Sequence, residues 1–503
     1  MSIVWLKLLI VFAIAFLVYH TVGAKYRWMI LLLASIGFIL IAAGIISFWY
    51  MFFAILVSFF GSNFINKVEN NSVKQLILGS SILLIIAEFV LLKFSGALSQ
   101  LSTNVSEFFA TTETIAGDAI VTLGVSYYSL ILIAYITDVY RKVTTVETNF
   151  LKHSLFSTYF PQILMGPIVR HKEMKEQLFS TKEISFDCIK FGVFRILWGI
   201  TKKIVIADRI LLPINTILGS YQEYSGMYIL FAMILFGLQF YIEFSAAMDI
   251  VLGISECFGI KMPENFNNPF FSKSVHDFWN RWHITFYSFL KDYIFYPVIR
   301  SKIMMKIKSA LEGIKHKWLA KHIPLFIAYF VIWSISSFRH GISFKYFIAM
   351  GMSPCIFMIL EDIFKLITDK VLKIKSLKNA LWAKIIQRIY VLTAMYLMWF
   401  FFRAETVSDC FNMFEKVLFD FNSANTITTI GVDKYDFGVI IIGITLIIIV
   451  DLLKEFKVDL RGIYIRCPLI VRWCAIIFFQ IVILLLGLYG PEYDPKDFMY
   501  FKF

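Results

Sequence analysis

Apolar runs of nearly membrane-spanning length recur along the chain, separated by shorter polar stretches. "WLKLLIVFAIAFLVYH" near the start and "IIFFQIVILLLGLYG" near the end are typical. A bilayer core is crossed by about 20 apolar residues in a helix, the form in which a segment in lipid satisfies its own backbone hydrogen bonds. The pattern predicts an all-α polytopic membrane protein with roughly 11–12 transmembrane helices. The expected spans are 2–20, 28–46, 47–61, 76–94, 115–138, 188–206, 226–250, 323–338, 343–360, 389–402, 437–453 and 473–490.

Two further apolar stretches are shorter and contain proline. They lie at about 154–169 and 284–299. Segments of this kind more often re-enter the membrane or lie in its interface than cross it. We therefore expect re-entrant or interfacial helices at both places.

Composition and charge agree with a membrane location. Hydrophobic residues make up 59% of the 503 residues, and the mean hydropathy is +0.74, whereas soluble domains are about 45–50% apolar. The net charge of +13 comes from loops rich in Lys and Arg, which are typical of cytoplasmic loops and suit anionic lipid headgroups. These loops are 170–190, 300–322, 365–388 and 454–472, while the acidic loop 403–436 is expected outside. We predict a multi-pass protein of the plasma membrane that contacts lipids and binds no nucleic acid.

Familiar soluble-enzyme motifs are missing from the sequence. The six cysteines are scattered without a CxxC pair, which argues against a metal site or a disulfide framework. The sequence also contains no GxSxG, HExxH, P-loop or GxGxxG motif, so serine-hydrolase, zinc and nucleotide-hydrolysis mechanisms have no support.

The stretch "MPENFNNPFFSKSVHDFWNRWHITFYSFLKDYIFYPV" at 262–298 is too polar for a lipid-facing span and too aromatic for a solvated loop. On a helix that begins near Ser274, Asp277 and Arg281 form an i,i+4 acid–base pair. The aromatic residues of that helix share another face, which comprises Phe278, Trp282, Phe286 and Phe289. One interpretation is an amphipathic helix in the membrane interface. The other is a helix that lines a polar cavity inside the membrane, with His283 facing substrate.

Two carboxylates lie within an apolar span, in "LQFYIEFSAAMDIVLG". Glu243 and Asp249 are six residues apart, so they do not share one face of a regular helix. The small residues between them permit close helix packing, and the carboxylates then serve as partners for buried arginines. Ionisable residues inside a membrane are also candidates for function.

The stretch "SSFRHGISF" at 336–344 lies between two apolar runs. His340 is the side-chain type best suited to proton transfer near neutral pH. The glycine after it permits close approach of a ligand or another backbone. A turn at the headgroups, with Arg339 and His340 facing water, explains the same residues without chemistry.

Several separated motifs resemble the membrane-bound O-acyltransferase family, in particular its bacterial branch that acetylates extracytoplasmic polysaccharides such as alginate and peptidoglycan. The motifs run from about residue 120 to the end, so we divide a single integral membrane domain into N-terminal transmembrane helices at 1–110 and a membrane-bound O-acyltransferase core at 111–503. They include "LGVSYYSLILIAYITDVYR", "FSTYFPQILMGPIVR", "WGITKKIVIADRI", "NRWHITFYSFLKDYIFYP", "FRHG", "WFFFRAETVSDCFNMF" and the terminal "DFMYFKF".

The resemblance implies a ring of membrane helices around a central tunnel, and it places catalytic roles on His340 and His283. The chain departs from the family pattern at Arg339, where many relatives have Trp, and at Glu243, where Asp is customary. The further candidates for substrate binding or tunnel lining are Asn280, Arg281, Trp282, Asp277, Glu243, Asp249 and Arg339.

The resemblance also implies the reaction and its partners. We expect an acyl group, most simply acetyl, to pass from a thioester such as acetyl-CoA to a hydroxyl of an extracytoplasmic polysaccharide, with no bound cofactor. An esterase-like acyltransferase outside the cell is the expected partner. The alternatives are D-alanyl transfer from a cytoplasmic carrier-protein thioester to teichoic acid, and, in a different class, a transporter or flippase for a lipid-linked sugar.

Overall fold

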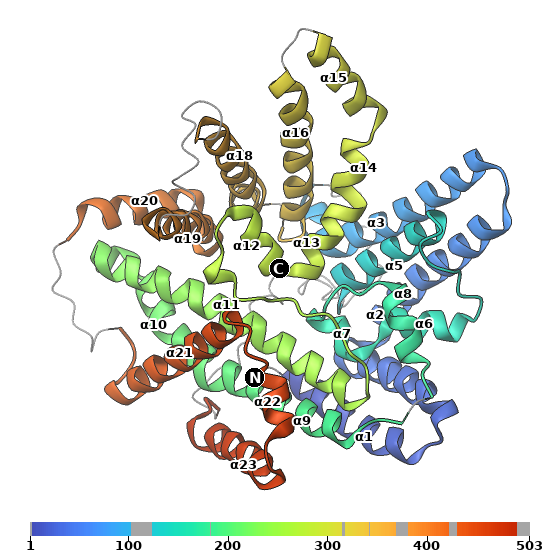
Figure 1. Ribbon diagram of the computed structural model, residues 1–503, viewed down its shortest axis with the longest axis horizontal. Coiled ribbons are helices and arrows are strands. Elements are labelled where there is room, and N and C mark those ends of the chain that lie inside the picture. The colour runs from blue at the N-terminus through green and yellow to red at the C-terminus, as the bar shows by residue number, and fades with distance from the viewer. Residues whose placement is uncertain are drawn as a thin grey trace. The chain divides into compact units, whose positions relative to one another are not determined.

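A computed structural model of the chain describes residues 3–101, 123–181, 183–313, 317–341, 343–368, 381–421 and 430–489. Within these ranges the chain is built from helices, and the one β-like pairing is an isolated bridge between Phe266 and Trp282 (Figure 1). The predicted all-α class is therefore confirmed. The predicted boundary near residue 110 and the terminal "DFMYFKF" lie outside the described residues.

Nine helical stretches of the described residues are long and apolar enough to cross a membrane, which confirms a multi-pass membrane protein. They include α1 (Ile3–Thr21), α2 (Arg27–Lys67), α3 (Asn71–Leu101), α11 (Gly226–Cys257) and α16 (Lys317–Phe338). The others are the stretch Phe344–Leu366, α19 (Leu381–Arg403), α21 (Lys434–Glu455) and α23 (Leu469–Leu486). The count is lower than the 11–12 spans expected from the sequence, for two reasons.

First, two expected spans are one element. The stretches 28–46 and 47–61 both fall within α2, a helix of 41 residues. Gly44, with φ 78° and ψ 176°, kinks it, a conformation that glycine adopts without a Cβ penalty. The predicted boundary therefore corresponds to a kink.

Second, two expected spans are not among these nine stretches. Of 115–138, the described part forms α5 (Val125–Tyr140), which has 16 residues. The stretch 188–206 forms α9 (Phe186–Ile200) followed by the π-helix Thr201–Ala207, in which Lys202 and Lys203 are buried. The two lysines make this segment too polar to be a simple span.

The two proline-containing stretches form short helices. The first contains α6 (Phe150–Thr158) and α7 (Phe160–Met165). The second contains α13 (Ile284–Leu290), the π-helix Lys291–Phe295 and α14 (Tyr296–Ile299). Their location relative to the lipid stays a prediction.

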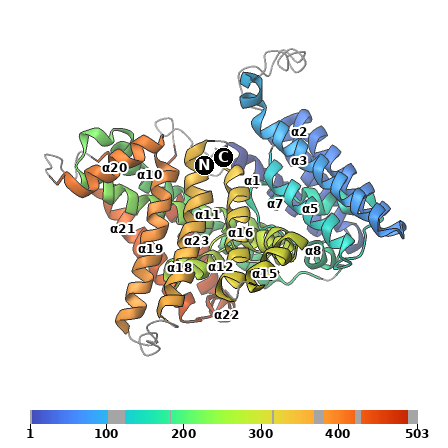
Figure 2. The same cartoon turned by 90° about the horizontal axis from the view of Figure 1, so that it is seen from above.

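The helices form two compact units, described separately. The first unit comprises residues 1–196 and 248–263. In it α2 packs against α1, α3, α5 and α6, and Figure 2 shows α2, α3 and α5 side by side. It also contains α7, α8 (His171–Leu178), most of α9 and the last part of α11.

The second unit comprises residues 197–247 and 264–503 and contains the candidate site. Most of α11 lies in this unit, and α11 is the most enclosed of the nine described stretches, with 78% of its most apolar window buried, against 6% for α23. Near the site, α16 packs against α15 (Lys302–Gly313) and α18 (Ser353–Leu366) (Figure 1). The remaining helices are α10 (Asp208–Gly219), α12 (Val275–Arg281), α17 (Phe344–Tyr346), α20 (Val407–Phe419) and α22 (Leu460–Arg466).

Candidate active site

The segment around His283 is a broken helix. The helix α12 begins after Ser274, whose side chain caps it by accepting a hydrogen bond from the Asp277 backbone at 2.9 Å. It ends at Arg281, and α13 begins at Ile284. The single continuous helix expected from the aromatic pattern is therefore wrong. His283 occupies the break with φ 48° and ψ 50°, a left-handed conformation that costs a non-glycine residue on the order of 1–3 kcal/mol.

The surrounding backbone holds this strained turn in place. Asn265 is fully buried, and its carbonyl accepts a hydrogen bond from the Ile284 N–H at 3.0 Å. Its side-chain oxygen accepts two more from Thr285, one from the backbone N–H at 3.0 Å and one from the hydroxyl at 2.7 Å. The Asn267 N–H bonds to the Arg281 carbonyl at 2.9 Å. The segment before α12 therefore fixes the backbone on both sides of His283.

The His283 ring is enclosed by two aromatic rings and a cation. Phe286 stacks on it at 5.0 Å between centroids, and Phe244 meets it edge-on at 4.9 Å. Nη1 of Arg339 lies 3.5 Å from His283 Nε2. Burial, the Arg339 guanidinium and His340 all hold the pKa of His283 well below its usual range, so the ring is neutral.

His340 lies in the turn that follows α16. Its backbone N–H donates to the Ser337 carbonyl at 2.9 Å, and its ring meets Phe402 edge-on at 5.6 Å. Gly341 has φ 141°, and a Cβ at that position would lie 3.1 Å from Cδ2 of Tyr346. The His-Gly pair is thus explained locally, because only glycine fits this conformation and this spacing.

A pocket in the second unit brings both histidines together. Arg339 and His340 line it from the turn after α16, and His283 lines it from the break before α13. Six of the thirteen lining residues are Trp, Phe or Tyr, and they come from α12, α13, α16, α19 and the residue that precedes His283: Trp279, Trp282, Phe286, Tyr287, Trp333 and Trp399. Histidine, arginine and indole groups around one pocket can bind an acyl group and exchange a proton with it.

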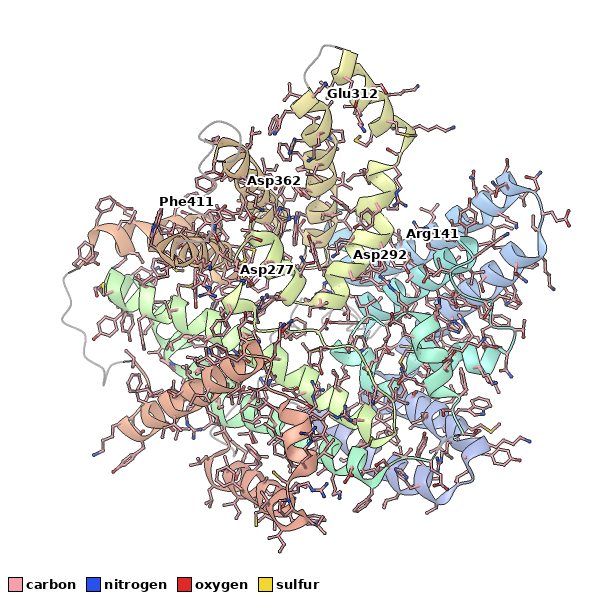
Figure 3. The ribbon with its side chains drawn as sticks, in the orientation of Figure 1. Arg141, Asp277, Asp292, Glu312, Asp362 and Phe411 are labelled. Carbon is pink, nitrogen blue, oxygen red and sulfur yellow. The ribbon has the colours of Figure 1, made fainter. Side chains whose placement is uncertain are left out.

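Of the other sequence candidates near α12, Trp282 lines the pocket, whereas Asp277, Asn280 and Arg281 are not among its lining residues. Arg281 pairs with Asp277 at 3.0 Å, as the i,i+4 spacing predicted, and with Glu455 at 2.8 Å. Figure 3 labels Asp277 on α12. Asn280 is exposed and accepts a hydrogen bond from Lys291 at 3.1 Å.

The two carboxylates of α11 are in ion pairs. Glu243 accepts from Lys203 Nζ at 2.5 Å and from the Gln239 amide at 2.8 Å, and Lys203 also pairs with Asp208 at 2.8 Å. Asp249 belongs to the first unit and pairs with Arg195 there at 2.9 Å. These pairs fit the interpretation that the carboxylates are partners for buried cations.

Sequence reasoning did not identify several pocket residues. Trp333 lies on α16 and Met398 on α19, and both resemble ordinary apolar residues of a span. Met350 lies on the π-helix Phe347–Met352, a helix type that often marks functional sites. Nothing in the local sequence distinguishes these positions. Trp279 was not identified either, although it lies in the aromatic-rich stretch 262–298.

Comparison with known proteins shows similarity to one family of membrane enzymes. Residues 140–311 match the model of the membrane-bound O-acyltransferase family. A peptidoglycan O-acetyltransferase from Helicobacter pylori is 27% identical over 70% of this chain and 67% of its own length. A probable alginate O-acetylase from Pseudomonas aeruginosa is 28% identical over 55% of this chain and 53% of its own length. A teichoic acid D-alanyltransferase from Bacillus subtilis is 28% identical over 48% of this chain and 59% of its own length.

The matches thus span about half to two thirds of the length of these relatives. They confirm the resemblance that the motifs indicated, including the branch in which polysaccharide O-acetylases and teichoic acid D-alanyltransferases occur together. The chain is thus similar to the membrane-bound O-acyltransferase family over residues 140–311 and to named members of its bacterial branch over longer stretches.

Proposed function

We propose that this protein is a membrane-bound acyltransferase that moves an acetyl group from a cytoplasmic thioester to a hydroxyl of an extracytoplasmic cell-wall or exopolysaccharide. The observation that carries the proposal is the convergence of His283 and His340, from distant parts of the sequence, on one aromatic pocket. Two relatives named as O-acetyltransferase or O-acetylase support the acetyl group and the polysaccharide acceptor.

In the proposed reaction His340 is the general base. The acceptor hydroxyl loses its proton to the imidazole while its oxygen attacks the thioester carbonyl carbon, and a C–O bond forms. The tetrahedral intermediate then collapses, the C–S bond breaks, and the leaving thiolate takes the proton from the imidazolium. A positioned base of this kind contributes about 10²–10⁴-fold to the rate.

His283 is the proposed stabiliser of the charge that develops on the carbonyl oxygen. Its Nε2 faces the Arg339 guanidinium, so the neutral ring carries its proton on Nδ1 and donates from there. A donor fixed in a water-poor site is effective because no reorganisation is needed as the charge forms. The hydrogen bonds that Asn265 accepts from Ile284 and Thr285 keep the ring oriented.

The proposal can be tested with purified protein in nanodiscs. Acetyl-CoA is offered together with a glycan fraction from cell envelopes, and CoA release and acetyl-glycan are measured. Release of CoA coupled to acetyl-glycan supports the proposal. No reaction with acetyl-CoA, combined with transfer from a D-alanyl carrier protein to teichoic acid, would replace it with the second candidate function, which the Bacillus subtilis relative favours.

A partner completes the proposal. Long polysaccharides lie outside the membrane, so we infer that an esterase-like acyltransferase there receives the acetyl group and passes it to the polymer. Mixing the reconstituted protein with and without an extracytoplasmic protein fraction tests this step. Equal polymer acetylation in both mixtures would show that no such partner is needed.

A further inference from the structure

Arg339 places a permanent positive charge in the wall of the proposed acyl-transfer pocket. The residue is 9% exposed and follows α16 directly. Its guanidinium carbon lies 4.4 Å from the centroid of the Phe286 ring, and Nη1 lies 3.5 Å from Nε2 of His283. A guanidinium keeps its charge in proteins, so any acyl group held beside His283 experiences a nearby cation.

The other lining residues strengthen the influence of the Arg339 charge on a bound acyl group. Among the described lining residues, Arg339 is the one with a permanent charge, and the others are the two histidines, one serine and aromatic or apolar side chains. Aromatic walls exclude water and lower the local dielectric, which strengthens the field of a charge at short range. The sign of the charge on a bound group therefore affects its binding more in this pocket than it would in solvent.

We propose that Arg339 determines which acyl groups the pocket accepts: neutral and anionic acyl groups are admitted, and cationic aminoacyl groups are rejected. This inference rests on the proposed function and refines it. In an aminoacyl thioester such as D-alanyl, the ammonium is attached to the carbon next to the carbonyl carbon. A carbonyl positioned at the histidines brings that ammonium close to the guanidinium.

Repulsion between two positive charges this close would discriminate strongly between a cationic and a neutral acyl donor. For two unit charges about 5 Å apart at an effective dielectric constant of about 20, the repulsion corresponds to roughly 100-fold in relative reactivity. Acetyl has no charge and experiences no such penalty. The charge of Arg339 thus favours the acetyl donor over the D-alanyl donor, two possibilities between which the named relatives do not decide.

A pair of donors that differ in charge but hardly in shape tests the proposal. D-alanyl-CoA and isobutyryl-CoA differ by an ammonium in place of a methyl group. Full-length protein in nanodiscs is given each donor with an envelope glycan fraction, and kcat/KM is measured from thiol release above the uncatalysed background. Acetyl-CoA serves as the reference donor.

We expect wild type to prefer isobutyryl-CoA by roughly 100-fold, from the repulsion above. Arg339→Met, which keeps an unbranched apolar side chain, should reduce this preference to less than about tenfold, and Arg339→Lys should retain most of it because the charge is kept. A residue that merely supports the fold would lower both rates together and leave their ratio unchanged.

Arg300→Met is the matched control. Arg300 also places its guanidinium over an aromatic ring, that of Tyr296 at 5.5 Å, but it is exposed and is not among the pocket residues. Its replacement should leave the preference as in wild type.

The outcomes separate the two proposals. Equal wild-type rates with the two donors would overturn the charge selectivity and leave the acyltransferase standing, and so would an unchanged preference in Arg339→Met. If Arg339→Met does not fold, Arg339→Gln removes the same charge, and the wild-type preference still decides. Failure of wild type to consume any thioester would overturn the proposed function, and the selectivity with it.

Discussion

Lys203 and Arg339 are both buried cations of the second unit, and their surroundings differ. Lys203 lies between the carboxylates of Glu243 and Asp208, at 2.5 and 2.8 Å, on a π-helix whose residues are all buried. Arg339 lies against the rings of Phe286 and His283 and lines a pocket. Burial of a charge is therefore not enough to identify the candidate site. The two cations are distinguished by their neighbours and by whether they line the pocket.

The comparison also separates stability from chemistry. A buried ion pair offsets its own desolvation, and removal of one partner leaves an uncompensated charge at a cost of about 3–5 kcal/mol. A cation over an aromatic face is stabilised by about 2 kcal/mol when desolvated. We therefore expect the Lys203 cluster to control folding and the residues around Arg339 to control turnover.

The largest effect is expected at His340. His340→Ala removes the proposed base, so acyl transfer should fall by about 10²–10⁴-fold. The melting temperature in detergent should change little, because the neighbouring rings of Phe402 and Tyr346 stay in place. Thiol release and thermal unfolding measured on the same preparation check both statements. Near-normal turnover would remove His340 from the mechanism.

Lys203→Met should act in the opposite way. It removes the cation that pairs with the buried Glu243 and the partly buried Asp208, so the variant should lose about 3–5 kcal/mol of stability. The remaining folded protein should keep the donor preference of wild type. Thermal unfolding in nanodiscs measures the loss, and a double variant with Glu243→Gln should recover part of it. An altered donor preference at normal stability would mean that the cluster belongs to the active site.

Gly341→Ala tests the turn that presents His340. An alanine there must adopt φ 141° and places its Cβ 3.1 Å from the Tyr346 ring. We expect a loss of about 1–3 kcal/mol in stability and a drop in turnover, because His340 is displaced. Unfolding curves and thiol release measure the two effects. If both match wild type, the turn adapts and the His-Gly pair needs another explanation.

The smallest effect is expected at Asn280, a candidate from the sequence that is exposed and is not among the pocket residues. Asn280→Ala removes one contact with Lys291. Stability should change by less than about 0.5 kcal/mol, and turnover by less than about twofold. A tenfold loss of turnover would show that the active site extends beyond the pocket toward the exposed face of α12.

The sequence predicted the local features of the site better than its assembly. The start of α12 at Ser274 and the Asp277–Arg281 pair follow from capping and i,i+4 spacing. The break at His283 does not, because no glycine or proline marks it. Its left-handed backbone is held by hydrogen bonds that the next two residues donate to Asn265, which precedes His283 by 18 positions in the sequence.

Prediction of the membrane spans from the sequence has the same limit: features set by distant residues are missed. Hydropathy identified α1, α11 and α23 because lipid imposes the same length and composition on every crossing helix. The buried lysines of the π-helix at 201–207 depend on tertiary neighbours, as the pairing of Lys203 with Glu243 shows. The π-helix at 347–352 likewise places Met350 at the pocket through packing against α16 and α19. Local sequence carries no information on such contacts.

The most direct test of the account is a cryo-EM structure of the protein in nanodiscs with an uncleavable analogue of acetyl-CoA that keeps the acyl carbonyl group. The account predicts that the carbonyl of the analogue lies in the pocket, within about 3 Å of a ring nitrogen of His283 or His340. The same density would show the acyl methyl group near the Arg339 guanidinium. An analogue bound with its carbonyl elsewhere, and with this pocket still filled by its aromatic side chains, would contradict the central claim.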